Sequence, residues 1–212
     1  MAFAQAPAAP MGGGYPVQIT VTDEREINRL WGIPFFGVLV RAIMAIPHFF
    51  VLAILGIGMY VWILLGWIPI LLTGRQPSLV VRLLTEFLQR YMRVAGYVFF
   101  LLPGSYPPLE PGNQNPVGLT MDVEGGSISR LWGIPFVGIF VRYIVLIPHL
   151  IVLGILGIVA YLSLIVLWIP ILATGKYPNA FANFYTSLFR YGARVAAYMF
   201  LLPVPYPPFS MS

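Results

Sequence analysis

The sequence has no cysteine, two histidines and seven acidic residues among 212, and these shortages exclude several classes of function. Without cysteine the chain has no disulfide, no thiolate metal site and no thiol nucleophile. With two histidines and no cluster of carboxylates, metal-dependent hydrolysis and nucleophilic triads lack the groups that they need. We therefore expect that the protein is not an enzyme.

Charged residues are also scarce. They make up 9% of the chain and hydrophobic residues 59%, whereas about a quarter of the residues in a typical soluble domain are charged. This composition indicates an integral membrane protein. The net charge of +5 rests almost wholly on arginine, since Lys176 is the only lysine, and the chain has too little solvated surface for a nucleic-acid-binding face. We expect phospholipids, not nucleic acid, as partners of these cations.

What the chain does have is a long internal repeat. The heptapeptide RLWGIPF at residues 29–35 recurs unchanged at residues 130–136, and the same offset relates Ile-Pro-His at 46–48 to 147–149. The pattern divides the chain into a flexible N-terminal arm (1–15), a first repeat (16–109), a linker (110–115) and a second repeat (116–212).

Each repeat is expected to begin with a short strand, because residues 16–21 and 116–123 alternate apolar and polar side chains. A single strand leaves its backbone hydrogen bonds unpaired, and the strand of the other repeat is the obvious partner. We expect this pairing to hold the two repeats together outside the membrane.

Residues 47–72 and 148–173 are apolar segments that exceed the roughly 20 residues needed to cross a bilayer. We predict one transmembrane helix there in each repeat, preceded by a short helix that lies at the membrane interface. The segments 78–102 and 179–202 carry a polar stripe, so they either lie in the interface or cross with the stripe facing protein; their length favours crossing. The expected fold class is an all-α integral membrane protein of two tandem repeats.

The distribution of charge sets the expected orientation. Arginines and Lys176 gather near the Thr-Gly turns at 73–74 and 174–175, whereas acidic residues flank the strands. The positive-inside rule then places these turns in the cytoplasm. It places the strands and the Tyr-Pro-Pro tails at 106–108 and 206–208 outside the cytoplasmic membrane.

His48 and His149 are the only histidines and hold matching places in the two repeats. Neutral imidazole is an axial ligand for haem or a chlorophyll-type magnesium, so these side chains are candidate cofactor ligands. The alternative, which we favour, is that each histidine forms an ordinary hydrogen bond or cap at the interface. The sequence itself requires no cofactor and predicts no metal site.

An arginine among apolar residues is costly unless it reaches headgroups or finds a partner. One hypothesis is a phospholipid-phosphate clamp, formed by Arg41 with Arg93 and by Arg142 with Arg194. The other, which we favour, is that Arg41 and Arg142 reach headgroups or a backbone carbonyl. The candidate residues at the lipid interface are Arg41, Arg93, Arg142, Arg194, Trp31, Trp67, Trp132 and Trp168.

The order of these motifs resembles a tandem pair of domain-of-unknown-function family 4389. The resemblance rests on Arg41, Ile-Pro-His at 46–48, Thr-Gly-Arg at 73–75, Arg-Val-Ala-Gly-Tyr at 93–97 and Tyr-Pro-Pro at 106–108, with their counterparts in the second repeat. It covers residues 16–209 and implies a prokaryotic integral membrane protein. It implies no enzyme activity.

From these features we expect a structural or assembly subunit of a larger membrane protein complex. Such a subunit docks other membrane protein subunits and phospholipids, and a homo-oligomer is compatible with the sequence. One alternative is a cofactor- or pigment-binding membrane protein with His48 and His149 as ligands. Another is a small transporter or lipid-binding protein.

Overall fold

The computed structural model describes residues 15–21, 23–33, 35–109, 116–121, 127–134 and 136–211. The expected flexible arm, apart from Tyr15, and the expected linker lie outside the described residues.

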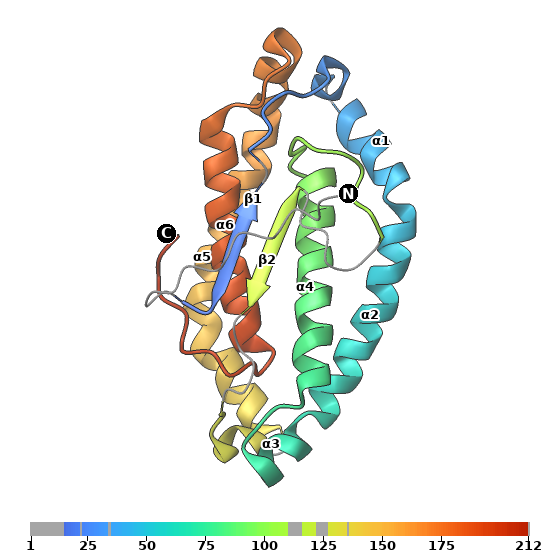
Figure 1. Ribbon diagram of the computed structural model, residues 1–212. Helices are drawn as coiled ribbons and strands as arrows, with labels where there is room; N and C mark the ends of the chain where they lie inside the picture. The colour runs from blue at the N-terminus through green and yellow to red at the C-terminus, as the bar shows by residue number, and fades with distance from the viewer. Residues whose placement is uncertain are drawn as a thin grey trace.

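The first repeat contains one strand, a short 3-10 helix and four α-helices (Figure 1). They are β1 (Val17–Val21), η1 (Arg29–Gly32), α1 (Phe36–Met44), α2 (Ile46–Leu65), α3 (Trp67–Thr73) and α4 (Ser78–Val98). The second repeat has fewer elements within the described residues, because one long helix stands in place of three. They are β2 (Val117–Met121), η2 (Arg130–Gly133), α5 (Val137–Thr174) and α6 (Asn179–Met199).

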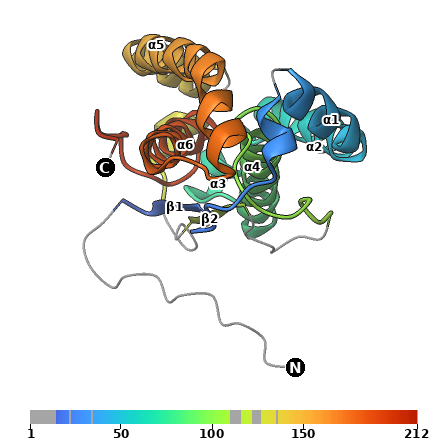
Figure 2. The same cartoon turned by 90° about the horizontal axis from the view of Figure 1, so that it is seen from above.

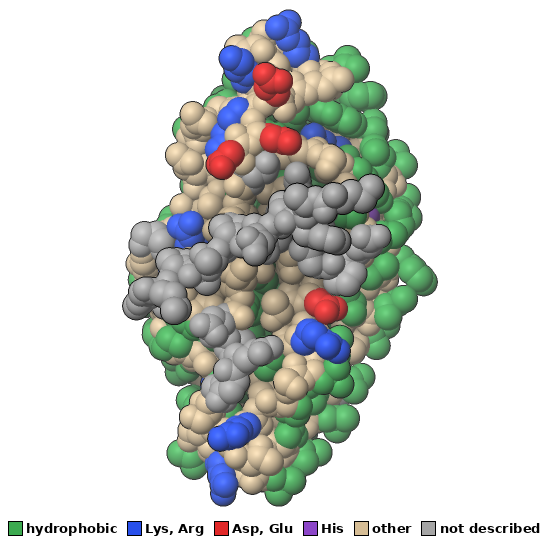
Figure 3. Space-filling view, in the orientation of Figure 1, with side chains coloured by type: hydrophobic (Ala, Val, Ile, Leu, Met, Phe, Trp, Pro, Cys, Tyr) green, Lys and Arg blue, Asp and Glu red, His purple; other side chains and the backbone are tan. Residues whose placement is uncertain are grey.

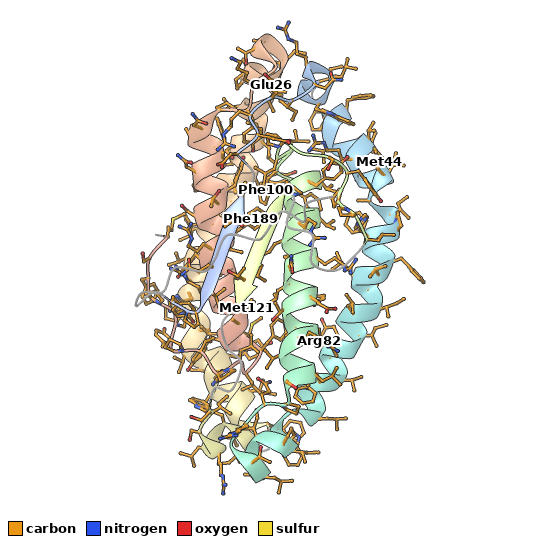
Figure 4. The ribbon with its side chains drawn as sticks, viewed as in Figure 1. Glu26, Met44, Arg82, Phe100, Met121 and Phe189 are labelled. Atoms are coloured by element: carbon orange, nitrogen blue, oxygen red, sulfur yellow. The ribbon has the colours of Figure 1, made fainter. Side chains whose placement is uncertain are left out.

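The elements form three layers (Figure 2). The two strands form a small sheet on one side, α4 and α6 lie behind it, and α1–α2 and α5 form the opposite side. The sheet is antiparallel, with Val17 opposite Met121 and Val21 opposite Val117, which confirms the expected pairing of strands from different repeats. Between α4 and α6, Phe100 meets Phe189 edge-on, with ring centroids 5.3 Å apart (Figure 4).

The two repeats exchange their N-terminal segments. β1 and η1 of the first repeat pack on α6 and α5 of the second, while β2 and η2 pack on α4 and α3. The glycine of each RLWGIPF segment permits this contact: a Cβ on Gly32 would lie 2.6 Å from the backbone nitrogen of Leu172, and one on Gly133 would overlap that of Leu71. The repeats therefore run antiparallel along the long axis, about an approximate twofold axis perpendicular to the sheet (Figure 1).

This exchange brings each Thr-Gly turn into contact with the other repeat. The Ile27 amide donates to the Gly175 carbonyl at 3.0 Å, and the Ile128 amide donates to the Gly74 carbonyl at 2.9 Å. Each Thr-Gly turn therefore touches the segment that follows the other repeat's strand. The placement of turns and strands on opposite sides of a membrane stays a prediction, and charge counting does not reveal which repeat a segment packs against.

The apolar segments are helical, but the two repeats differ. α5 continues for 38 residues through Pro148 and Pro170, so the second repeat lacks the separate interfacial helix that was expected. In the first repeat α1 is separate and is bent by 61° from α2. Within the described residues one helix, α5, is long and apolar enough to cross a membrane, or two if the bent α1–α2 pair counts as one span. Neither α4 nor α6 meets this criterion, so the expected second crossing helix finds no support.

Candidate functional site

The most extensive surface feature is an apolar face formed by α1, α2, α3 and α5. Large hydrophobic side chains are exposed along its whole length; examples are Phe50 (68% exposed), Ile57 (65%), Ile158 (62%) and Ile165 (62%). In the most apolar stretch of α5, 11% of the residues are buried. No described residue of α6 adds a large exposed hydrophobic side chain to this face. The molecule is thus strongly amphipathic from side to side.

The opposite side, formed by the sheet and the flanks of α4 and α6, is polar. Figure 3 views this side: charged side chains lie across it and at both ends, while hydrophobic side chains gather along the α1–α2 edge. Thr20 and Thr120 are exposed on the sheet, and Arg82 is exposed on α4 (Figure 4). Polar and apolar residues therefore occupy different layers of the same small fold.

Arg41 lies between the two sides and is 2% exposed. Its guanidinium donates to the carbonyls of Tyr97 at 2.8 Å and Leu102 at 3.0 Å, where α4 ends. The aromatic rings of Trp31 and Tyr97 flank it, with centroids 4.9 and 4.5 Å from its central carbon. A cation here satisfies carbonyls at the negative end of the helix dipole. We call this group the arginine stack.

The second repeat contains the same stack. Arg142 donates to the carbonyls of Tyr198 at 2.7 Å and Leu202 at 3.4 Å, and it lies against the rings of Trp132 and Tyr198. The geometry in both repeats favours a backbone-carbonyl partner over a phosphate clamp. Trp31 and Trp132 are half-buried against these arginines.

Arg93 and Arg194, the other expected clamp residues, are also buried. Arg93 donates to the Pro108 carbonyl at 3.3 Å, and Arg194 lies over the ring of Tyr15 at 5.2 Å. Burial lowers the pKa of Arg93 to about 10, which leaves it cationic at neutral pH. These arginines hold the tail and the N-terminal segment against the helices, and their role at a lipid interface stays a prediction.

His48 and His149 are both fully buried, and each lies under the Tyr-Pro-Pro tail of its own repeat. The Nδ1 atom of His48 shares a hydrogen bond of 2.9 Å with the Tyr106 hydroxyl. The Nδ1 atom of His149 shares one of 2.6 Å with the Tyr191 hydroxyl, and its ring is stacked 3.8 Å from Phe209. The structure does not bring the two histidines together, because α2 packs on α4 and α5 packs on α6, on either side of the twofold axis (Figure 2). Ligation of haem or a pigment stays a prediction that requires the tails to move.

The tail tyrosines also provide hydrogen-bond donors for backbone carbonyls next to the two helical prolines. The Tyr106 hydroxyl donates to the Met44 carbonyl at 3.0 Å, and the Tyr206 hydroxyl donates to the Val145 carbonyl at 3.2 Å. These carbonyls lie in the helical turn before Pro47 and Pro148, where a proline disrupts the backbone hydrogen bonds. The remaining expected anchors, Trp67 and Trp168, are half-buried near the ends of the apolar segments.

The sequence did not predict that segments of both repeats meet at each end of the molecule. The side chains of Arg29 and Arg130 lie across Gly175 and Gly74 of the other repeat: a Cβ on those glycines would lie 3.3 and 3.6 Å from the arginine Cγ atoms. The exact recurrence of RLWGIPF was the available signal, but the sequence does not show that each copy docks on the other repeat.

Comparison with known proteins identifies the family of the chain. A family model described as "Domain of unknown function (DUF4389)" matches residues 37–108 and, a second time, residues 137–211. The chain belongs to this family. The DUF4389 matches cover the helices and tails of both repeats, while β1, η1, β2 and η2 lie before the matched segments. No curated protein and no solved structure matches the chain.

Proposed function

We propose that this tandem DUF4389 protein is a structural subunit that lies in the plane of a membrane. Its apolar face enters one leaflet, and its sheet side stays in water, where it is open to protein partners. The observation that carries the proposal is the division of the fold into an apolar face of long exposed helices and a polar sheet side. An exposed apolar surface of this extent marks a membrane or protein interface.

The dimensions support a position in the plane over a crossing one. At 1.5 Å per residue, the 38 residues of α5 extend about 57 Å, nearly twice the roughly 30 Å of a bilayer core. A crossing orientation would also place β1 and β2, with the exposed Thr20 and Thr120, at the depth of the hydrocarbon. With the twofold axis along the membrane normal, both apolar helices enter the same leaflet and both Thr-Gly turns face the same side.

The apolar face suits acyl chains better than a single protein partner. Exposed hydrophobic residues occur around most of α5, and a flat partner covers only one side of a helix. Exposed tyrosines on this face, Tyr60, Tyr143 and Tyr161, are a residue type enriched where protein meets the membrane interface. The positive-inside rule favours the cytoplasmic leaflet, because the basic segments of the protein then stay on the cytoplasmic side and are not carried across the membrane.

Extraction and co-purification test this proposal. Alkaline carbonate should leave the protein with the membranes, and mild detergent should extract it with stoichiometric partner subunits, identified by mass spectrometry. Thr120→Glu on the sheet side should remove partners without releasing the protein, whereas Ser78→Glu, outside the sheet, should retain them. Release by carbonate would contradict the membrane placement. Recovery as a lone monomer or homo-oligomer would contradict the role as a subunit.

A further inference from the structure

Each end of the molecule, here called a pole, combines segments from both repeats. At one pole Arg29 crosses Gly175, directly beside Lys176; at the other Arg130 crosses Gly74, directly beside Arg75. An isolated antiparallel β-bridge fixes each of these positions, with Glu26 paired to Lys176 and Ser127 paired to Arg75. Two exposed cations from different repeats are thereby held next to each Thr-Gly turn.

Exposed apolar side chains follow Arg29 and Arg130 in the sequence. Leu30 and Leu131 directly follow the two arginines and are 56% and 71% exposed. Phe35 and Phe136 are 90% and 69% exposed, among the highest values for large hydrophobic residues in the described chain. Each pole thus presents a basic pair and an adjacent leucine, with a phenylalanine further along the same heptapeptide; at one pole the exposed Glu26 lies beside Lys176.

The two phenylalanines also adopt an unfavourable backbone conformation. Phe35 has a φ of 61° and Phe136 a φ of 60°, in the left-handed region that bulky residues rarely occupy. Glycine or asparagine fits this conformation at lower cost. Because both side chains are exposed, packing within the fold does not explain why an aromatic residue stands at both positions.

We propose that the two poles are binding sites for anionic phospholipids. The paired cations bind the headgroup phosphate, and the adjacent leucine and phenylalanine enter the acyl-chain boundary beneath it. This inference rests on the proposed placement in the membrane plane, which brings both poles to the headgroup level of the same leaflet. The glycine of the repeated heptapeptide docks on the other repeat, but this docking does not explain the exposed arginine, leucine and phenylalanine. The lipid site assigns a function to these exposed residues.

Lipid titration of the detergent-purified protein, followed by native mass spectrometry, tests the proposal. The wild-type protein should retain phosphatidylglycerol in preference to phosphatidylcholine, with two preferred molecules per chain. Arg75→Gln/Arg130→Gln should lose one of them, and each removed charge should weaken retention about fivefold. Arg29→Gln/Lys176→Gln should do the same at the other pole. Arg82→Gln, which removes an exposed charge away from the poles, should leave the preference unchanged.

The remaining outcomes are equally decisive. Equal retention of both lipids by the wild-type protein, or an equal effect of Arg82→Gln, would overturn the proposal. Inorganic phosphate that displaces phosphatidylglycerol at millimolar concentration would assign the poles to free anions instead of lipid. Carbonate extraction of the same variants separates the two proposals: variants that stay in the membrane without a lipid preference refute the pole sites alone.

Discussion

The two repeats contain the same motifs, but their apolar segments form different helical rods: α1–α2–α3 in the first repeat and α5 in the second. In the first repeat the apolar rod is interrupted at Ala45 and Gly66, between α1, α2 and α3. The second repeat has Leu146 and Leu167 at these positions, both buried, and its rod is the continuous α5. Since each rod contains the Ile-Pro-His proline, the proline does not decide where the helix breaks. Glycine is a weak helix former and alanine a strong one, so residue type accounts for the break at Gly66 but not for the break at Ala45.

Gly66 shows how the interruption is accommodated. A Cβ at this position would lie 2.7 Å from the indole of Trp62, so the indole occupies the space that a larger residue would need. The arginine stack, in contrast, has the same partners in both repeats. The rods differ at positions that are buried in both repeats, whereas the stacks agree where the buried ends of α4 and α6 need donors.

The largest expected effect tests the equivalence of the two stacks. Arg41→Met or Arg142→Met should each lower the free energy of unfolding by about 3 kcal/mol, because two buried carbonyls lose their donor at about 1–3 kcal/mol each. Denaturant unfolding in detergent measures this loss. Lysine at either position should restore only part of it, since an ammonium does not stack as a guanidinium does. A loss at one stack but not at the other would break the equivalence.

The contacts between the exchanged segments should be next in size. Gly32→Ala or Gly133→Ala should cost about 2 kcal/mol, since the new methyl group overlaps the backbone of the other repeat. Gly154→Ala is the control, because no atom lies within 4 Å of its Cβ position. It should stabilise α5 by up to about 1 kcal/mol, measured by the same unfolding transition. The docking of η1 and η2 would be refuted if all three variants behaved alike.

The tails should respond unequally. Tyr106→Phe removes two hydrogen bonds, to Met44 and His48, and should cost about 1–2 kcal/mol. Tyr206→Phe removes one bond of 3.2 Å, because His149 pairs with Tyr191, and should cost about 0.5–1 kcal/mol. Thermal unfolding of the two variants compares them directly. Equal losses would mean that the histidine contacts do not distinguish the repeats.

The smallest effect on stability concerns the poles. Phe35→Asn and Phe136→Asn should leave stability unchanged or raise it by up to about 1 kcal/mol, because asparagine tolerates a positive φ. The same variants should partition less into phosphatidylglycerol vesicles. A clear loss of stability would instead assign the phenylalanine side chains to the fold.

Much of the local structure could be predicted from the sequence. The strand pairing followed from the duplication, and Gly74 and Gly175 end their helices at a φ of 69°, as expected for a glycine cap. Periodicity could not show that β1 packs on α6 of the other repeat, since either copy offers the same pattern. The sequence allows a backbone carbonyl as the partner of Arg41, but the acceptors lie 56 and 61 residues away and are brought near only by the fold.

Labelling of single cysteines tests the central claim most directly, because the chain contains no cysteine of its own. Ser78→Cys and Asn179→Cys place exposed thiols at the beginnings of α4 and α6, near opposite poles; Ile155→Cys lies on the apolar face. In inverted membrane vesicles, a membrane-impermeant maleimide should label both pole cysteines, and Ile155→Cys should be protected. In intact cells neither pole cysteine should react. Labelling of the two poles from opposite sides would contradict a protein that lies in the membrane plane.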